Sequence, residues 1–248
     1  MALLFAPKLL SRGEKNDKTP EQVLDFPEGP GQVIFREDSF DIYIVNIRKE
    51  KLSLYHKKPD GTLFSNIGNV KTHLENLGDT LVFACNAGIY DEKFTPKGLF
   101  IQDGKNIAPA DTNSPASGGN FYLKPNGVFL IYDHSMSIMQ TPDYHPNDSI
   151  LQALQSGPML VIQGKIHPAF KENSSNTYVR NGVGMLDAEH AVFAISRHPV
   201  NLFTFAKLFQ EYFHCQNALY LDGAISKMYL PKLRPNDLDG KLAGILAV

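Results

Sequence analysis

The sequence predicts a single α+β domain built on a strand-rich mixed sheet with a few packed helices. Short apolar runs of strand length recur between turn signals along most of the chain, whereas helical spacing appears in few places. Strands and helices also follow one another irregularly, without the alternation typical of a doubly wound sheet. We expect a loose, Pro- and Gly-rich lead-in at residues 1–30 and one domain at 31–248.

The strands are predicted from apolar runs bounded by turn residues. Residues 81–85 and 218–221 are continuous apolar runs of buried-strand length. Pro125-Asn126-Gly127 predicts a hairpin between two other runs, because Asn-Gly readily adopts the positive φ that such turns need. The expected strands are 41–47, 52–55, 81–85, 121–123, 128–132, 159–162, 191–195, 218–221 and 245–248.

Helices are predicted at three places. Apolar residues recur at helical spacing over 202–213, directly after Asn201, which is a candidate N-cap. A shorter apolar stripe over 70–77 ends at Gly78, a typical helix C-terminus. Residues 149–154 are expected to form two helical turns.

The net charge and the cysteine content indicate which partners and which redox compartment to expect. The chain has 24 Lys and Arg, 26 Asp and Glu and a net charge of −2, so no basic excess points to nucleic acid. Its two cysteines, Cys85 and Cys215, form neither a disulfide framework nor a zinc spacing. Two buried free thiols are the expected state, and one long-range disulfide is possible if the protein is exported.

No segment is expected to span a membrane. The N-terminal apolar run is broken by Pro7 and Lys8, is too short for a span and lacks a signal-peptide core. The compartment stays open: periplasmic or secreted if an N-terminal leader has been lost, and otherwise cytoplasmic. The oligomeric state is also left open.

Five segments share one pattern, in which an apolar strand runs into polar residues and glycine. Glycine lets the backbone come close to a ligand, and a strand end holds the neighbouring polar side chain rigidly. One such junction is typical of an ordinary turn, but five of them favour a shared cleft. The junctions lie at 85–91, 117–122, 155–160, 180–184 and 221–226.

The sequence motifs at and near these junctions resemble those of a known family. NAGIYD, PKGLFI, GNFYLKPNGVF, QSGPMLV, RNGVG and LYLDGAIS occur in this order over roughly residues 32–248. As a set they resemble the phosphodiester glycosidase family, and especially its bacterial branch. That family includes the lysosomal uncovering enzyme, which removes N-acetylglucosamine from a phosphodiester on mannose. Members close to that enzyme carry an LDGGGS-like element where this chain has LDGAIS, a departure that bears on substrate range more than on fold.

The resemblance implies a hydrolase that cleaves a sugar from a glycosyl-1-phosphodiester. Asp222 is the expected base or nucleophile, and Arg180 the expected phosphate ligand, because a guanidinium matches phosphate oxygens. Asn86 can donate to and accept from sugar hydroxyls, and Asp91 is the candidate second carboxylate. Without the resemblance, Asp222 is typical of a carboxylate that caps a turn, Asn86 of a turn residue that closes the strand over 81–85, and Arg180 of an exposed surface.

Small and glycine-flanked residues complete the candidate site. Their hydroxyl, amide and backbone N–H groups are suited to phosphate, although local backbone capping is the alternative for each. No HExxH, P-loop or GxGxxG motif is present, and no metal or cofactor is expected. The expected substrate-binding residues are Gly119, Asn120, Ser156, Gly157, Asn181, Gly223 and Ser226.

Two alternative functions remain open. A non-catalytic module that binds a phosphoglycan would need the same cleft, because fold resemblance does not guarantee chemistry. A metal-dependent phosphodiesterase would use Asp222, Asp91 and a histidine. His198 and His214 are expected to be packed or surface residues, and His214 cannot serve Cys215 as a base because adjacent helix residues point in different directions.

Overall fold

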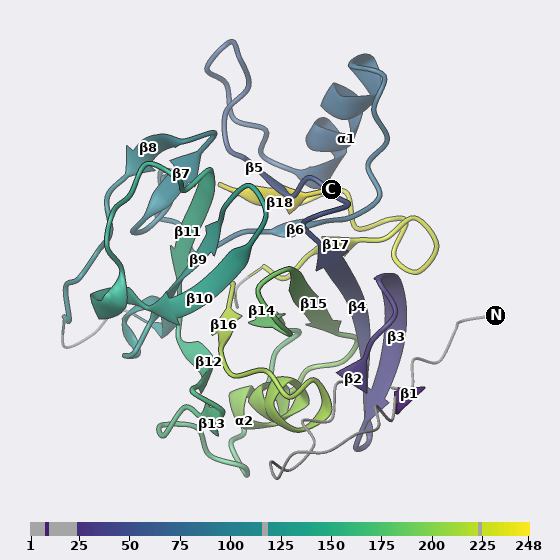
Figure 1. The fold of residues 1–248 in the computed structure, drawn as a ribbon, viewed down its shortest axis with the longest axis vertical. Coiled ribbons are helices and arrows are strands. Elements are labelled where there is room, and N and C mark those ends of the chain that lie inside the picture. Colours follow the sequence, from purple (N-terminus) through teal and green to yellow (C-terminus); the bar gives the residue numbers. More distant parts are fainter. Residues whose placement is uncertain (1–7, 10–23, 116–118, 223–224) are drawn as a thin grey trace, which may run out of the picture.

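The structure is a computed structural model that describes residues 8–9, 24–115, 119–222 and 225–248. Its largest sheet has seven strands, and Figure 1 shows how this sheet meets the other elements. All strand pairs in the described residues are antiparallel, where a mixed sheet was expected. In spatial order the seven strands are β13 (Lys165–Ile166), β12 (Met159–Ile162), β16 (Ala218–Tyr220), β14 (Asn181–Met185), β15 (His190–Ser196), β4 (Asp38–Asn46) and β3 (Gly29–Phe35).

The remaining strands form three smaller sheets. The five-stranded sheet has the order β10 (Met136–Gln140), β9 (Gly127–Ile131), β11 (Gln152–Ser156), β7 (Phe100–Gln102) and β8 (Lys105–Ala108). The four-stranded sheet has the order β17 (Met228–Tyr229), β6 (Ala84–Asn86), β18 (Ile245–Ala247) and β5 (Ser53–Tyr55). A short pair joins β1 (Lys8–Leu9) to β2 (Leu24–Asp25).

The helices are few and short, and α1 and α2 lie at opposite ends of the molecule (Figure 1). Asn66 caps the start of α1 by accepting the N–H of Asn69 at 2.8 Å, and Gly78 follows the helix with φ of 84°. Asn201 caps α2 in the predicted way, accepting the N–H of Thr204 at 2.8 Å. The helical elements are α1 (Ile67–Asn76), η1 (Asn120–Tyr122), η2 (Thr141–Asp143), α2 (Leu202–Lys207) and a π-helical continuation, η3 (Leu208–Tyr212).

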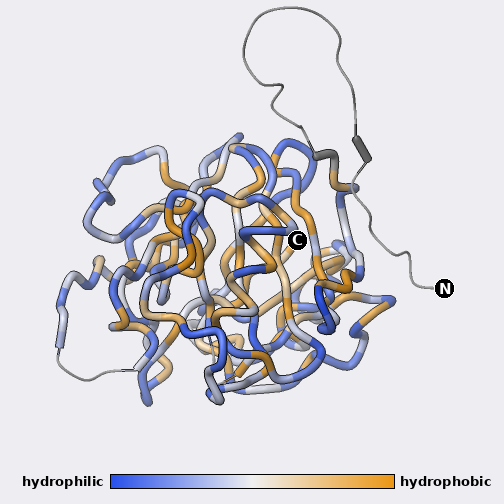
Figure 2. Tube along the Cα trace, turned by 90° about the horizontal axis from the view of Figure 1, so that it is seen from below, coloured by the Kyte–Doolittle hydropathy of each residue, from blue (hydrophilic) through white to orange (hydrophobic). Residues whose placement is uncertain are grey.

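Both faces of the seven-stranded sheet are buried. Along β4, Ile42 and Ile44 face a core shared with α2 and η3, whereas Tyr43 and Val45 face the core shared with the other two large sheets. This alternation follows from the two-residue period of a strand. Figure 2 shows the same layering, with apolar segments inside and polar segments in the outer loops. The α+β class predicted from the sequence is confirmed.

Three local predictions are wrong. The segment 149–154 is not helical, because β11 pairs with both β9 and β7 in the five-stranded sheet. Residues 121–123 form no strand and belong largely to the 3₁₀ helix η1. Pro125-Asn126-Gly127 is therefore no hairpin turn; Asn126 is fully buried and its amide donates to the carbonyl of Phe121 at 3.0 Å.

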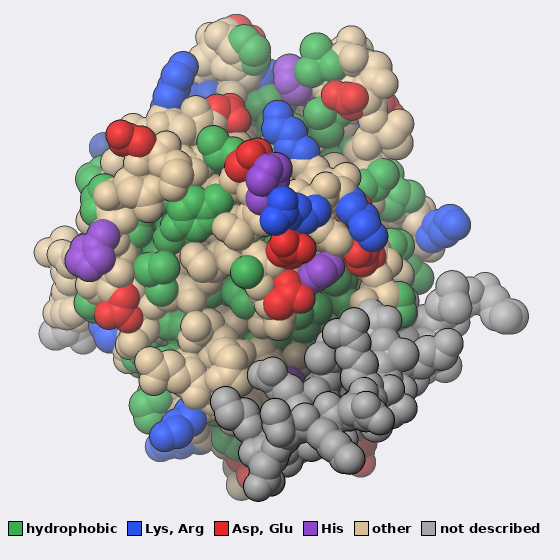
Figure 3. All heavy atoms as spheres, viewed as in Figure 1, with side chains coloured by type: hydrophobic (Ala, Val, Ile, Leu, Met, Phe, Trp, Pro, Cys, Tyr) green, Lys and Arg blue, Asp and Glu red, His purple; other side chains and the backbone are tan. Residues whose placement is uncertain are grey.

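Two further expectations concern the termini and the cysteines. Cys85 and Cys215 are both buried and unpaired, as expected for structural thiols. Residues 1–7 and 10–23 lie outside the described residues, so most of the predicted lead-in stays a prediction. Within the described residues, no helix is long and apolar enough to cross a membrane. Charged side chains of both signs intermingle on the face seen in Figure 3.

Candidate active site

Three of the five junctions meet at one end of the seven-stranded sheet. Asp222 follows β16 after one residue, and Asn181 is the first residue of β14. Both β14 and β12 run antiparallel to β16, so their starts lie beside its end. Ser156 ends β11, and Gly157 and Pro158 join it to β12, so Ser156 and Gly157 reach the same place. Strand pairing alone therefore brings together Ser156 and Asp222, which are 66 residues apart along the chain.

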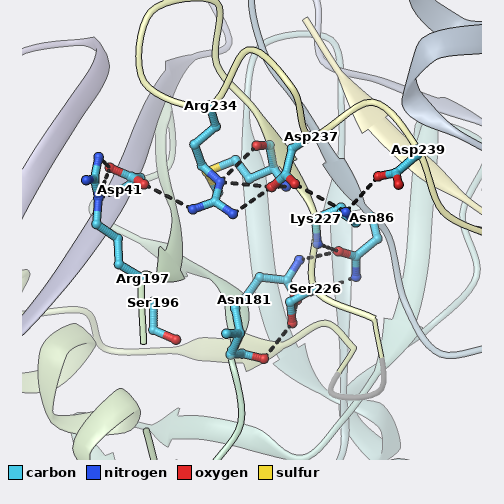
Figure 4. A network of polar contacts seen from close by, with 12 residues as sticks. Asp41, Asn86, Asn181, Ser196, Arg197, Ser226, Lys227, Arg234, Asp237 and Asp239 are labelled. Carbon is cyan, nitrogen blue, oxygen red and sulfur yellow. Dashed lines mark hydrogen bonds and ion pairs between the residues drawn. The ribbon is translucent and has the colours of Figure 1, made fainter. Parts of the chain in front are cut away.

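A pair of buried amides joins a fourth junction to these three. Asn181 Nδ2 donates to Asn86 Oδ1 at 2.8 Å, and Asn86 Nδ2 lies 3.5 Å from Asn181 Oδ1. The two residues are 0% and 2% exposed, so each satisfies the polar groups of the other away from water. Asn86 Oδ1 also accepts the backbone N–H of Lys227 at 2.8 Å. The pair thus fixes β6 against β14 and the segment after Asp222 (Figure 4).

Asp222 is held by this amide pair and by Ser226. Its backbone N–H donates to Asn181 Oδ1 at 3.3 Å, and its carbonyl accepts the Ser226 hydroxyl at 3.0 Å. The residue is 6% exposed. Burial raises the pKa of Tyr220 to about 12, and the nearby Asp222 charge adds to that rise. Burial and the same charge raise the pKa of Tyr90, so the carboxylate lies near both phenols.

Close backbone contacts bring the first and third junctions together. The hydroxyl of Ser156 donates to the carbonyl of Leu221, the residue before Asp222. A Cβ on Gly88 would lie only 2.5 Å from the carbonyl oxygen of Gln155, so the two segments can meet only because position 88 carries no side chain. The hydroxyl of Ser156 therefore supports the backbone at the end of β16.

The second junction lies at the side of this cluster. Gly119, with φ of 69°, precedes η1, which begins at Asn120. Asn126 bonds the carbonyl of η1 residue Phe121 and leaves no room for a side chain at Gly157, where a Cβ would lie 2.6 Å from Asn126 Cβ. The junction therefore joins the others through Asn126. Ser117, Gly118 and Gly223, parts of the predicted junctions, lie outside the described residues.

Arg180 lies in the interior, where an exposed phosphate ligand was expected. Its side chain is fully buried, and its guanidinium donates to the carbonyls of Val200 and Asn176, to Asn176 Oδ1 and to the hydroxyl of Tyr220, at 2.7–2.8 Å. Direct contact with phosphate would break these bonds. The hydroxyl of Tyr220 accepts from the guanidinium, and the Asp222 charge acts on the same phenol, so the cation lies close to the site but in the protein interior.

Asp91 caps its own loop. Its Oδ1 accepts the backbone N–H groups of Lys93 at 2.8 Å and Thr95 at 2.9 Å. The bond from Thr95 is the largest cause that lowers the pKa of Asp91. Asp91 is therefore a turn cap, a role that was not expected, and the geometry does not favour it as the second catalytic carboxylate. Its neighbour Tyr90 lies closer to the site, and its hydroxyl donates to the carbonyl of Lys241.

Sequence reasoning missed three residues around Asp222. Tyr90 and Tyr220 were counted as apolar parts of motifs, although a buried phenol beside a carboxylate is a polar site group. Lys227 was not considered; its ammonium contacts Asp237 at 3.3 Å and Asp239 at 2.7 Å. The only sequence signal for these residues is their place inside or directly after the glycine-containing motifs.

The described residues offer no ready metal site. They contain no group of three or more His, Cys, Asp or Glu side chains placed to hold a metal ion. The polar groups around Asp222 are amides, hydroxyls and phenols, a set suited to hydroxyl-rich ligands.

The comparisons with known proteins decide the family. A family model described as phosphodiester glycosidase matches residues 79–243. This chain belongs to the phosphodiester glycosidase family. The matched region contains Asn86, Asn181 and Asp222, so the amide pair and its carboxylate lie within the family domain. The resemblance predicted from the motifs is thereby confirmed.

One curated protein and two solved structures are also similar to this chain. Escherichia coli K12 "Uncharacterized protein YigE" is 33% identical over 188 residues, which is 76% of this chain and 73% of that protein. The zebrafish N-acetylglucosamine-1-phosphodiester α-N-acetylglucosaminidase catalytic domain matches with a TM-score of 0.60 and 15% identity, covering 99% of this chain and 88% of that one. A putative exported protein from Burkholderia pseudomallei matches with a TM-score of 0.55 and 9% identity, covering 85% and 73%. At these identities, the two solved structures show the shared fold.

Proposed function

We propose that this member of the phosphodiester glycosidase family hydrolyses a glycosyl-1-phosphodiester at the anomeric carbon, with Asp222 as base or nucleophile. The observation that carries the proposal is the support given to Asp222, whose backbone is held by Asn181 and Ser226 where the family motifs converge. A residue whose backbone is fixed in this way presents its side chain from the same place in every turnover.

One carboxylate is sufficient for this reaction. Ordinary glycosidases need a second carboxylic acid to protonate the leaving oxygen. A phosphomonoester anion is a stable leaving group at neutral pH, so its protonation contributes little. This requirement suits a site in which Asp91 caps a loop and Asp222 remains as the candidate.

The bond changes follow from this chemistry. If Asp222 acts as a base, it takes a proton from water, the water oxygen attacks the anomeric carbon, and the carbon–oxygen bond to phosphate breaks. The electron pair leaves with the phosphomonoester. If Asp222 acts as a nucleophile, it first bonds the anomeric carbon itself, and water then hydrolyses that intermediate. Asn86 and Asn181, which are buried and bonded to each other, act in this proposal by positioning Asp222.

Arg180 acts in this proposal without touching phosphate. Its charge is buried next to the hydroxyl of Tyr220, where a low dielectric strengthens its field. A fixed positive charge close to the site stabilises negative charge that develops on the leaving phosphate. The role first expected for Arg180, a direct phosphate clamp, is therefore replaced by one that acts at a distance.

The position of bond cleavage tests the reaction class. A phosphodiester of N-acetylglucosamine 1-phosphate and p-nitrophenol is incubated with the protein in ¹⁸O-water. Cleavage at the anomeric carbon places the label in the sugar, whereas a phosphodiesterase places it in the phosphate. Label in phosphate refutes the proposal, and binding without turnover supports the non-catalytic module instead. The anomer first released, followed by NMR, separates a base from a nucleophile because the two invert and retain configuration.

A matched pair of variants tests the role of Asp222. Asp222→Asn removes the charge while nearly preserving shape, and we expect kcat to fall by about 10²–10⁴-fold. Asp91→Asn is the control, because Asn caps turns about as well as Asp, and we expect kcat to stay within about twofold. Unchanged turnover by Asp222→Asn would remove the central residue of the proposal.

A further inference from the structure

A polar pocket of about 420 Å³ lies near the candidate active site. It opens between the start of β4, the residues after β15 and the loop that follows β17. We call it the arginine pocket and define it by six of its lining residues, which are Asp41, Arg197, His198, Arg234, Asn236 and Asp237. The mechanism proposed above makes no use of it.

A fully buried carboxylate organises the pocket. Asp41 is 0% exposed and accepts from Arg197 at 2.7–3.1 Å and from Arg234 at 3.2 Å. Burying this charge costs free energy unless it is paired, and here two guanidinium groups share it. The second carboxylate, Asp237, contacts Arg234 at 2.6 Å and Lys227 at 3.3 Å. Each carboxylate of the pocket therefore has two cationic partners.

The arrangement of charge in the pocket favours an anion at its opening. Two cations, Arg197 and Arg234, and two carboxylates, Asp41 and Asp237, line it. The side chains of Asp41 and Asp237 are 0% and 16% exposed, whereas that of Arg197 is 35% exposed. The negative charges therefore lie inside the pocket, and a positive charge faces the solvent, where an anionic ligand can reach it.

Hydrogen-bond donors remain available for such a ligand. Arg197 uses Nε and Nη2 for Asp41, and its Nη1 contacts no acceptor among the described residues. Its side chain is 35% exposed, so this edge of the guanidinium can reach a ligand. His198 and Asn236 are exposed and also have no hydrogen-bond partner in the described part of the chain. A guanidinium edge, an imidazole and an amide together suit a phosphate or carboxylate group.

The pocket lies within reach of a substrate bound at Asp222. Asn181 on β14 pairs with Ile195 on β15, and Ile195 pairs with Asp41 on β4. At a strand spacing of about 4.8 Å, the pocket lies roughly 10–15 Å from the end of β16. Figure 4 shows the polar link, in which Lys227 joins Asn86 through its backbone N–H and Asp237 through its ammonium.

We propose that the arginine pocket binds an anionic group of the substrate, carried by the part of the molecule beyond the phosphodiester. This inference rests on the proposed function, because it names the leaving group of that reaction. The sugar is cleaved at Asp222, and the phosphate or carboxylate on the far side of the diester lies against Arg197, His198 and Asn236. The preferred substrate therefore carries at least two negative charges.

Charged substitutions at position 236 test the pocket and leave its ion pairs in place. Asn236→Asp adds a negative charge at the exposed rim, and Asn236→Lys adds a positive one. Titration calorimetry with inorganic phosphate is performed in the Asp222→Asn background, so that it does not depend on turnover. We expect Asn236→Asp to weaken phosphate binding about fivefold and Asn236→Lys to strengthen it similarly. Asn106→Asp, exposed on β8 in another sheet, is the matched control and should change nothing.

Diester substrates with and without an additional negative charge then test whether the pocket contributes to catalysis. Diesters of N-acetylglucosamine 1-phosphate with glycerol, with glycerol phosphate and with glycerate are compared. We expect the two anionic diesters to have a KM at least about fivefold lower than the neutral one, and Asn236→Asp to remove that advantage in KM. The two anionic arms separate phosphate from carboxylate.

The outcomes of these experiments distinguish the pocket proposal from the proposed function. Phosphate binding that ignores the charge at position 236, or an equal KM for neutral and anionic diesters, overturns the pocket proposal. Phosphate binding that follows this charge in a protein that hydrolyses no diester leaves an anion pocket and refutes the proposed function instead.

Discussion

Asn181 donates its side-chain amide to Asn86 across 95 residues of sequence and, with its own oxygen, accepts the backbone N–H of Asp222. One buried side chain therefore connects two sheets and orients the residue proposed to carry out catalysis. The bond to Asp222 is long, at 3.3 Å, but both residues are buried, where the lower dielectric makes such bonds stronger. The relationship makes Asn181 a positioning residue whose loss should affect chemistry more than binding.

Asn181→Ala tests whether this residue acts on chemistry more than on substrate binding. It leaves the N–H of Asp222 without its acceptor and removes the donor to Asn86 Oδ1, and we expect a loss of about 1–3 kcal/mol in the free energy of unfolding. We expect kcat to fall at least about tenfold, with a smaller change in KM, because Asp222 shifts. Denaturant unfolding and steady-state kinetics measure the two effects. Asn106→Ala, at an exposed position, should alter neither, and an unchanged kcat in Asn181→Ala would contradict the positioning role.

Arg180→Lys tests whether this cation holds phosphate or supports the fold. A lysine keeps the charge but cannot make the four bonds that the guanidinium makes to Val200, Asn176 and Tyr220. We therefore expect a loss of about 3 kcal/mol in the free energy of unfolding, with KM nearly unchanged in the folded fraction. A stable variant with a strongly raised KM would instead indicate direct phosphate contact.

The contrast between Arg180 and Asp222 shows what the sequence could predict. Asp222 follows an apolar strand, so its place at a buried strand end follows from the sequence pattern. Arg180 stands in an equally polar motif, yet it points inward, because Tyr220 on the next strand and the loop carbonyls of Asn176 and Val200 supply its acceptors. Those partners come from three other segments, and no local pattern reveals them.

The same contrast separates the strands that the sequence predicted from those that it did not. Strands with continuous apolar runs, such as β12 and β15, were predicted within about one residue of their bounds, since burial on both faces leaves a clear signal. β11 was predicted as a helix, because its sequence QALQS has little apolar content and its strand form depends on pairing with β7 and β9. Polar, glycine-rich β14 was seen only as a site motif for the same reason.

Tyr220→Phe tests the raised pKa of this phenol. Because burial raises its pKa to about 12 in the folded protein, the unfolded chain loses the proton first as pH rises above 10. The stability linked to Tyr220 is therefore complete below pH 10 and is lost between pH 10 and pH 12, by about 2–3 kcal/mol. We expect the free energy of unfolding to fall less steeply over this range in Tyr220→Phe than in the parent protein. Equal slopes would contradict the shifted pKa.

Gly88→Ala tests whether the first and third junctions must touch for the site to form. The new Cβ would lie 2.5 Å from the backbone oxygen of Gln155 and 3.3 Å from Ser156 Cβ, and a backbone atom cannot move aside as a flexible side chain can. We expect a loss of about 1–3 kcal/mol in the free energy of unfolding, as for other overpacked sites. Because Ser156 supports the carbonyl of Leu221, we also expect kcat to fall in the protein that remains folded.

Gly68→Ala is the matched control for this substitution. Gly68 lies in the first turn of α1, where the nearest atoms to a new Cβ are 3.4 Å away, and alanine favours a helix by about 1 kcal/mol over glycine. This variant should be as stable as the parent or more so, with unchanged kcat. If Gly88→Ala behaves like Gly68→Ala, the two junctions are not forced together at this point, and the convergence around Asp222 does not depend on their contact.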